Sequence, residues 1–352
     1  MVLNASLPTT EAISNIMAKE DPLGHQCLLE RIGSITEKAA ILLKDPVSIR
    51  PTHPDAPIIV TGVGSSQAHA QYLAYLINQY TSTTAVALPL VSFTKKLPPS
   101  TNEHTLIVFS QGLSSNARIA LKHCNAFKET FLITAQSSPT QDLAPEIKPI
   151  HIPCDEEKGL LIRTIGPFLG FLASLQLVEY VWPGAIPSCT EETLLEALKT
   201  TPQKSQALQK ELSLEACQAG CTFLTTPGLA LSCYNLGFKF LEGLFLPMPA
   251  IWDILTFTHG PFQQLRQHPG PILSLTGNQK DNMLFQKAET MITACSTTHA
   301  QLQATLSSPW SILEYEMILN HWLLGELKKS SIDQKNWPGK GEDAKLYDID
   351  YL

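Results

Sequence analysis

A short apolar strand, followed at once by a glycine-containing turn and a helix, constrains the fold of this chain more than any other stretch. Residues 58–61 read Ile-Ile-Val-Thr, and a run without a polar face is typical of a strand buried on both sides. Residues 68–80 repeat apolar side chains at helical spacing. The turn at 62–66 places Ser65 and Ser66 where that helix begins. Unpaired N–H groups and a partial positive charge at a helix start suit a phosphate, so this stretch predicts an anionic-ligand site.

The alternation of strand and helix continues along the chain. In the first half, the sequence predicts a helical stretch at 8–45, strands at 85–90, 105–109, 130–134 and 149–152, and helices at 117–124 and 159–182. In the second half, it predicts strands at 221–226 and 272–277 and helices at 191–220, 229–242, 281–295 and 310–327. Strands that alternate with helices are typical of a parallel sheet covered on both faces. We therefore predict an α/β chain in which one architecture is used twice.

Proline-rich and glycine-containing links divide the chain. Prolines between residues 46 and 57 precede the first strand, and Pro183-Gly184 follows the long helix at 159–182. At 352 residues the chain has room for two domains. We predict an N-terminal helical segment at 1–50, a first domain at 51–190, a second domain at 191–330 and a C-terminal tail at 331–352.

Composition indicates a globular protein with a small ligand. Hydrophobic residues make up 44% of the chain and charged residues 16%, so the chain can bury a core. The net charge of −7, without a compensating basic block, argues against a nucleic-acid partner. A phosphate would then be held by local donors. The most apolar long segment, 166–182, contains Gln176 and Glu179, which favours a buried helix over a membrane span.

The cysteines and the N-terminus predict a cytoplasmic protein. The 8 cysteines include no CxxC pair, and no histidine cluster accompanies Cys217 and Cys221, so we expect no metal site. Scattered thiols are typical of a reducing compartment. The N-terminus has no basic segment followed by an apolar stretch, so we expect no signal peptide.

The turns after the first and third predicted strands resemble the sugar-phosphate loops of the sugar isomerase (SIS) domain family. Gly64-Ser65-Ser66 is similar to that family's first loop, Gly-Thr/Ser-Ser. Ser110, Gln111 and Ser115 are similar to its second loop, Ser-Gln-Ser-Gly-x-Thr/Ser, although residues 112 and 113 are Gly and Leu where Ser and Gly are usual. The resemblance implies that a sugar phosphate binds through Ser65, Ser66, Ser110, Gln111 and Ser115.

Three further motifs resemble the double-SIS isomerase half of glucosamine-6-phosphate synthase (glutamine–fructose-6-phosphate aminotransferase). Residues 239–242, Lys-Phe-Leu-Glu, are similar to its Lys-x-x-Glu, and residues 258–261, Thr-His-Gly-Pro, to its Lys-His-Gly-Pro. Asp333-Gln334 and the later Lys340 are similar to its tail, where Asp-Gln precedes a reactive lysine. The resemblance covers most of the chain. It implies two tandem SIS domains, each a flavodoxin-like, doubly wound parallel sheet of five strands flanked by helices.

The resemblance also assigns roles in aldose–ketose chemistry. Proton transfer between C1 and C2 needs one base that reaches both carbons, and Glu242 is the candidate, with Lys239 one turn away to bias its charge. Opening of the cyclic sugar needs a proton shuttle, for which His259 is the candidate. In the resembled synthase this histidine comes from the neighbouring subunit, which implies a homodimer. Lys340 could form a Schiff base with an open-chain ketose.

Simpler interpretations of these residues stay open. Lys239 and Glu242 can be a surface pair, His259 a loop histidine and Lys340 a solvated tail lysine. Glu157 with Gly159 resembles the Glu-x-Gly segment that precedes the long helix in these proteins. There, Val-Ala-Ser-Thr-Lys is usual, and this chain has Leu-Leu-Ile-Arg-Thr at 160–164. This difference predicts altered contacts to the sugar.

The sequence thus predicts an enzyme. We expect a phosphosugar isomerase, or an aldose–ketose isomerase coupled to deamination, that acts on a hexose or hexosamine phosphate without a metal or cofactor. No glutaminase activity is expected, because the chain begins Met1-Val2 and has no N-terminal cysteine nucleophile. The alternative is a catalytically silent protein that senses a sugar phosphate and regulates a partner. The two hypotheses differ in whether the protein, with Glu242 as the base, converts the sugar phosphate that it binds.

Overall fold

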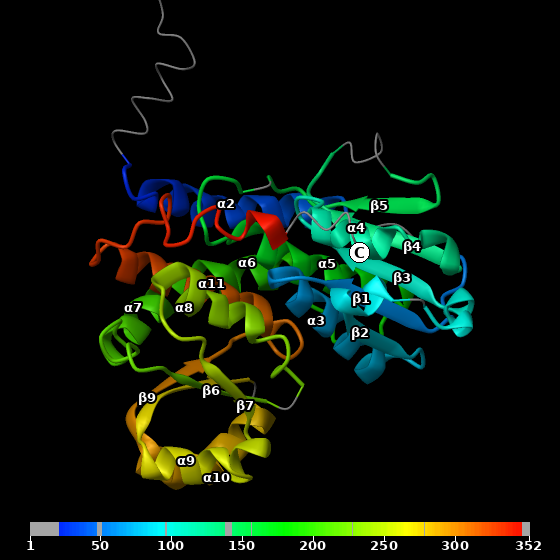
Figure 1. The fold of residues 1–352 in the computed structure, drawn as a ribbon. Coiled ribbons are helices and arrows are strands. Elements are labelled where there is room, and N and C mark those ends of the chain that lie inside the picture. The colour runs from blue at the N-terminus through cyan, green and yellow to red at the C-terminus, as the bar shows by residue number, and fades with distance from the viewer. Residues whose placement is uncertain are drawn as a thin grey trace, which may run out of the picture.

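The computed structural model describes residues 21–47, 51–95, 97–137, 143–155, 157–226, 228–277 and 279–346. Its strands form two parallel sheets, the first in the upper part of Figure 1 and the second in the lower part. The first sheet contains β1 (Ile58–Gly62), β2 (Ala85–Pro89), β3 (Thr105–Phe109), β4 (Glu129–Thr134) and β5 (Ile147–His151). The second contains β6 (Thr222–Thr225), β7 (Ala250–Asp253), β8 (Gly270–Thr276) and β9 (Ser296–Gln303).

The strand order creates a switch point between β1 and β3. The order in the first sheet is β2-β1-β3-β4-β5, so the chain leaves β1 toward one side and later returns to the other. Both neighbours of β1 are parallel to it, with Thr61 opposite Val108. The loops that follow β1 and β3 therefore lie side by side at the carboxyl edge, where open α/β sheets bind ligands. The second sheet, in the order β7-β6-β8-β9, repeats this arrangement around β6.

Helices cover both faces of each sheet. The α-helices are α2 (His25–Lys44), α3 (Ser65–Tyr80), α4 (Ser115–Leu121), α5 (Ile165–Val181), α6 (Glu191–Lys199), α7 (Thr201–Glu211), α8 (Tyr234–Leu244), α9 (Pro261–Gln267), α10 (Gln279–Cys295) and α11 (Ser311–Leu327). Short 3-10 helices are η1 (Leu90–Thr94), η2 (Pro99–Glu103), η3 (Cys124–Ala126), η5 (Thr256–Thr258) and η6 (Ala344–Leu346). None of the helices in these ranges is long and apolar enough to cross a membrane.

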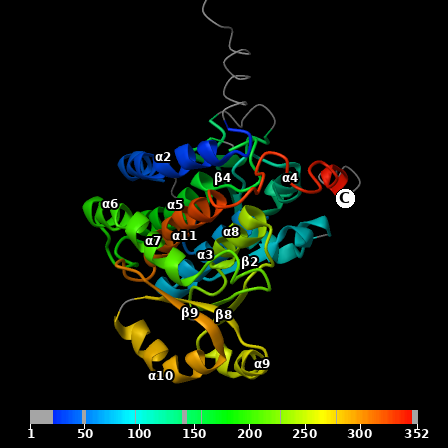
Figure 2. The same cartoon turned by 90° about the vertical axis from the view of Figure 1, so that its left-hand side faces the viewer.

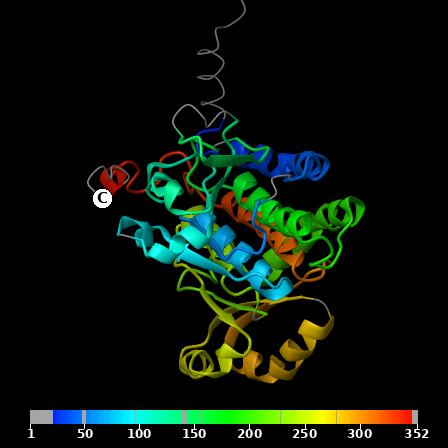
Figure 3. The same ribbon diagram turned by 90° about the vertical axis from the view of Figure 1, so that its right-hand side faces the viewer.

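One hydrophobic core runs through both halves of the chain. It joins buried side chains of β1, α3 and α5 to those of β6, α8 and α11. Two smaller cores lie on the outer faces, one under η1 and α4 and the other under α9 and α10. Figures 2 and 3 show α9 and α10 on the side of the second sheet that faces away from the first half. The shared core continues across the predicted boundary at residue 190.

The predicted fold class is confirmed, with three differences. The second sheet has four strands in the described part of the chain, one fewer than predicted. β7 and β9, the edge strands of the second sheet, were not predicted, and their side chains are largely exposed or half-exposed. The short helix α9 was also missed. Of the helical stretch predicted at 8–45, α2 occupies His25–Lys44, and residues 1–20 lie outside the described residues.

Candidate functional site

Two serine-bearing loops meet at the β1/β3 switch point. Ser65 and Ser66 form the first turn of α3, and Ser115 is the first residue of α4. Ser65 and Ser66 are half-buried and Ser115 is exposed. Among the residues that the structure describes, none of these three hydroxyls has a hydrogen-bond partner. They are therefore free to bind an anionic ligand.

The remaining two residues of the predicted phosphate site shape the second loop. Ser110 is 6% exposed, and its Oγ accepts a hydrogen bond from the Ser114 N–H at 3.2 Å. Ser114, which sequence reasoning left out, caps α4 by accepting from the Ala117 N–H. Its signal was a serine directly before a helix, the usual N-cap residue. Leu113 has a φ of 49°, the left-handed conformation that glycine prefers.

The side chain of Gln111 is fully occupied within the protein. Its Nε2 donates to the Asp155 carbonyl at 2.7 Å and to Glu157 Oε2 at 3.0 Å. Its Oε1 accepts from Arg163 at 3.2 Å. A Cβ on Gly166 would lie only 2.2 Å from Gln111 Oε1, so a glycine makes room for this amide. Contact between Gln111 and a phosphate is thus left to its backbone N–H, which differs from the expected role of the side chain.

The carboxylate of Glu157 caps the amino end of α5. It is 3% exposed, has a φ of 52°, and accepts hydrogen bonds from the N–H groups of residues 164, 165 and 166 at 2.8 to 3.0 Å. This cap explains why α5 begins at Ile165 and not at the predicted residue 159. Because Glu157 also accepts from Gln111, it ties the second loop to the start of α5.

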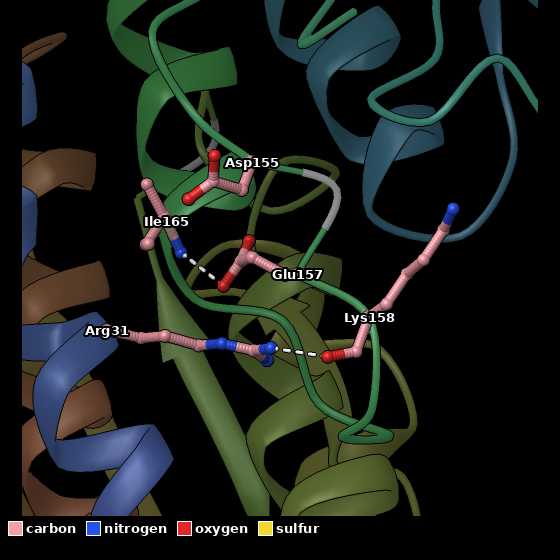
Figure 4. Close-up of a pocket in the computed structure, with 5 residues that line it drawn as sticks. All are labelled: Arg31, Asp155, Glu157, Lys158 and Ile165. Carbon is pink, nitrogen blue, oxygen red and sulfur yellow. Dashed lines mark hydrogen bonds between the residues drawn. The ribbon is translucent and has the colours of Figure 1, made fainter. Parts of the chain in front are cut away.

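A pocket of about 350 Å³ lies beside this carboxylate (Figure 4). It is lined by Arg31, Asp155, Glu157, Lys158 and Ile165. Arg31 of α2 donates to the Lys158 carbonyl at 2.7 Å and so holds the loop between β5 and α5. The pocket adjoins the anchor of Gln111, since Asp155 and Glu157 both accept from that amide.

Glu242 is a partly buried carboxylate with a shifted pKa. It is half-buried near the carboxyl end of α8, which packs against α3, the helix that carries Ser65 and Ser66. Burial raises the pKa of the Glu242 carboxyl, against the opposing charges of Lys239 and Arg163. A carboxylate with a raised pKa is a stronger proton acceptor than an exposed one.

Lys239 is not part of a surface pair with Glu242. Its Nζ lies 2.5 Å from Glu316 Oε1 on α11, and both side chains are wholly buried. Asn235 donates to the other oxygen of Glu316 at 2.8 Å. Glu316 was missed, because the helix predicted at 310–327 carries three glutamates and nothing in their spacing singles this one out.

His259 and Lys340 are both exposed. His259 is exposed at the end of η5, which packs against β7 and α9, and in the described residues its side chain makes no hydrogen bond or ion pair. Lys340 is exposed as well. Its Nζ donates to the Lys335 carbonyl at 2.5 Å and lies 4.6 Å from the centre of the Trp337 ring. In the part of the chain that the structure describes, neither side chain makes a hydrogen bond or ion pair with Glu242.

Gln334 connects the two halves of the site. Its Nε2 donates to the backbone carbonyls of Glu242 and Gly243 at 3.0 and 2.8 Å. Its Oε1 accepts from the Ile162 N–H at 3.1 Å, next to the arginine that holds Gln111. Gln334 is 0% exposed, so these bonds are shielded from water. From the Asp333-Gln334 motif, the sequence analysis had predicted a role for Lys340 and none for Gln334 itself.

Fold and site together define a doubly wound α/β protein with a candidate ligand site at the switch point of its first sheet. A comparison with protein-family profiles gives no match, and neither does one with curated protein sequences. Solved structures do share the fold. Glucosamine-6-phosphate deaminase from Thermotoga maritima has a TM-score of 0.69 at 17% identity, with 88% of this chain and 97% of that chain covered.

Two other similar structures carry related descriptions. The C-terminal domain of glucosamine-fructose-6-phosphate aminotransferase from Francisella tularensis has a TM-score of 0.64 at 13% identity, covering 87% of this chain and 96% of that chain. Tagatose-6-phosphate ketose/aldose isomerase from Escherichia coli has a TM-score of 0.54 at 15% identity, covering 94% and 98%. The TM-scores show that the fold is shared, and at identities this low the similarity extends to the fold alone.

Proposed function

We propose that this chain is a SIS-domain enzyme that binds a hexose or hexosamine phosphate at the β1/β3 switch point. It interconverts the aldose and ketose forms, with or without loss of an amino group. The observation that carries this proposal is that three serine hydroxyls without a hydrogen-bond partner in the described residues lie on the loops at this switch point, while the half-buried Glu242 lies on α8, which packs against α3. The fold similarity to a glucosamine-6-phosphate deaminase and a ketose/aldose isomerase supports it.

Each side chain has a distinct role in the proposed reaction. Ser65, Ser66 and Ser115 donate to the phosphate, with backbone N–H groups of the second loop, while Ser110 and Gln111 shape that loop. Glu242 takes the proton from one carbon and returns it to the next, and its raised pKa makes it a better base. Lys340 would have to turn away from Trp337 before it could assist at the carbonyl.

The free state of all eight cysteines agrees with a cytoplasmic location.

A partner subunit supplies His259 in this proposal. An exposed apolar stripe runs along α8 and the residues beside its two ends, and consists of Leu231, Tyr234, Leu241 and Phe245, between 38% and 60% exposed. Helical spacing puts Glu242 at the edge of this stripe. A second copy that covers the stripe would close over Glu242 and could present its own exposed His259 there.

A catalytically silent sensor is the second candidate. It is favoured by the second loop, where Gly112 replaces a serine and the Gln111 amide is already occupied. Such a protein would hold the phosphosugar without turnover.

A ligand panel separates these proposals. Hexose and hexosamine 6-phosphates, with fructose 6-phosphate and glucosamine 6-phosphate included, are expected to raise the unfolding temperature, because a ligand of the native state stabilises it by mass action. In the Ser65→Ala/Ser115→Ala variant, the shift should be lost. The matched control Ser34→Ala, on α2, should keep it. If several ligands bind and none turns over, the sensor takes the lead. If none shifts the wild-type protein at millimolar concentration, the phosphate site is wrong.

Mixed dimers test the shared site. When Glu242→Gln and His259→Ala chains are unfolded, mixed in equal amounts and refolded, about a quarter of wild-type activity is expected. Half of the dimers are then mixed, and each mixed dimer has one site with both native residues. Each variant refolded alone should stay inactive. A mixture as inactive as its components would show that each chain uses its own His259 or none.

A further inference from the structure

A buried polar cluster joins α8 to α11. The Lys239 ammonium contacts Glu316 Oε1 at 2.5 Å, and Asn235 donates to Glu316 Oε2 at 2.8 Å. The carboxylate of Glu316 is therefore held at both oxygens, by two residues one turn apart on α8. Apolar packing surrounds the cluster, with the rings of Phe240 and Trp322 stacked 4.8 Å apart.

Stability alone gives a weak reason for such a pair. Removing two charges from water costs several kcal/mol per ion. A protein with well-packed apolar side chains in place of a buried ion pair is often as stable as one with the pair. α8 and α11 already bury many apolar residues in the shared core. A role for the charges themselves is therefore worth testing.

Lys239 has two carboxylates within its reach. Glu242 lies three residues later on the same helix, so the two side chains are neighbours on α8. Glu316 comes from the facing helix. Within the described residues, the ammonium contacts Glu316 and makes no hydrogen bond to Glu242.

We propose that Glu316 is a positioning residue, which draws the Lys239 ammonium away from Glu242 and so keeps Glu242 a strong base. This inference rests on the proposed function, because it is in proton transfer between C1 and C2 that the strength of this base matters. Glu316 itself does not touch the substrate.

The surrounding charges set the direction of the expected effect. Glu242 is faced by Lys239 on its own helix and by Arg163 from the segment before α5, and both lower its pKa against the effect of burial. Glu316 is faced by Lys239 and Asn235 from α8 and, at longer range, by Glu157. When Glu316 is made neutral, Glu242 is the carboxylate left beside Lys239 among the described residues. The ammonium then turns to Glu242 and lowers its pKa further.

The test is the pH dependence of turnover in Glu316→Gln. The acidic limb of kcat/KM should move to lower pH by roughly one unit, and kcat at the plateau should fall because Glu242 is a weaker base. Glu314→Gln is the matched control. Glu314 is equally buried on the same helix and pairs with Lys204, so its loss should reduce stability without moving the limb. An acidic limb in Glu316→Gln that stays in place or moves to higher pH would overturn the proposal.

A second variant covers a failure of Glu316→Gln to fold. Lys239→Met/Glu316→Gln removes both charges and leaves no buried ion without a partner. Glu242 then loses the field of Lys239, so the acidic limb should move above that of wild type. A limb at the wild-type position would contradict the proposal.

A measurement without turnover separates this inference from the proposed function. The carboxyl carbon of Glu242 can be titrated by NMR in protein labelled at glutamate, with the signal assigned from Glu242→Gln. Its midpoint should be lower in Glu316→Gln than in wild type. If wild type turns over no phosphosugar and the midpoint still shifts, the proposed function fails and the charge arrangement stands. If turnover is present and the midpoint does not shift, the positioning role of Glu316 fails alone.

Discussion

Replacement of Glu242 by glutamine is expected to lower kcat for phosphosugar turnover by a factor on the order of 10³, while the ligand still binds. Glutamine keeps the shape of the side chain and cannot accept the proton. In wild type, the rate should rise with pH as Glu242 ionises. Because burial raises the pKa of this carboxyl, the acidic limb of kcat/KM should lie above the ordinary range of a glutamate. Steady-state kinetics between pH 4 and 9 measures both effects.

The control for this variant is Glu326→Gln. Glu326 is also buried, but it pairs with Lys329 and accepts from the Leu214 N–H, away from the loops of the first sheet. Its replacement should leave the rate close to wild type. Ligand-induced thermal shifts should persist in Glu242→Gln. If Glu242→Gln keeps more than a tenth of wild-type kcat, another group is the base.

Replacement of Glu157 by alanine is expected to cost about 3 kcal/mol of unfolding free energy or more, because a charged cap that accepts three backbone N–H groups is lost. The same change frees the Gln111 amide, so phosphosugar affinity should fall as well. Urea unfolding and ligand titration measure the two effects. The position also has a φ of 52°, which strains any residue except glycine.

Glycine at the same position separates the two contributions. Glu157→Gly loses the same hydrogen bonds and relieves the strained backbone, so it should be more stable than Glu157→Ala by about 1 kcal/mol. Glu157→Gln keeps one carbonyl oxygen as an acceptor and should be the least affected of the three. If all three variants unfold at the wild-type urea concentration, the carboxylate does not stabilise the start of α5.

Central strands were predictable from the sequence, as were the edge strands β2 and β5 of the first sheet, whereas the edge strands β7 and β9 of the second sheet were not. β1 and β3 are runs of apolar residues bounded by turns, and the predicted ranges match them closely because both faces of a central strand must be apolar. β9 reads Ser-Thr-Thr-His-Ala-Gln-Leu-Gln. Among the described strands it pairs only with β8, and just two of its side chains, Ala300 and Leu302, are buried, so its pattern is not distinct from that of a loop.

In the candidate site, the loops were predictable from local sequence motifs, whereas contacts between residues far apart in the sequence were not. Ser65 and Ser115 follow buried strands, and this is a local pattern. The partner of Lys239 lies 77 residues away, and no spacing rule connects α8 to Glu316. The occupied amide of Gln111 likewise depends on Glu157 and Arg163, which lie 46 and 52 residues further along the chain. Such contacts follow from how the helices pack.

The bonds of Gln334 have a consequence for the order of events during synthesis. This one buried side chain bonds to α8 and to the segment before α5, and its backbone N–H donates to Leu23 at the start of the described chain. None of these bonds can form until residue 334 has left the ribosome, by which time both sheets have been translated. The first sheet and its loops can therefore assemble early. The position of Glu242 on α8 relative to the segment that carries Arg163 is fixed only among the last steps of folding.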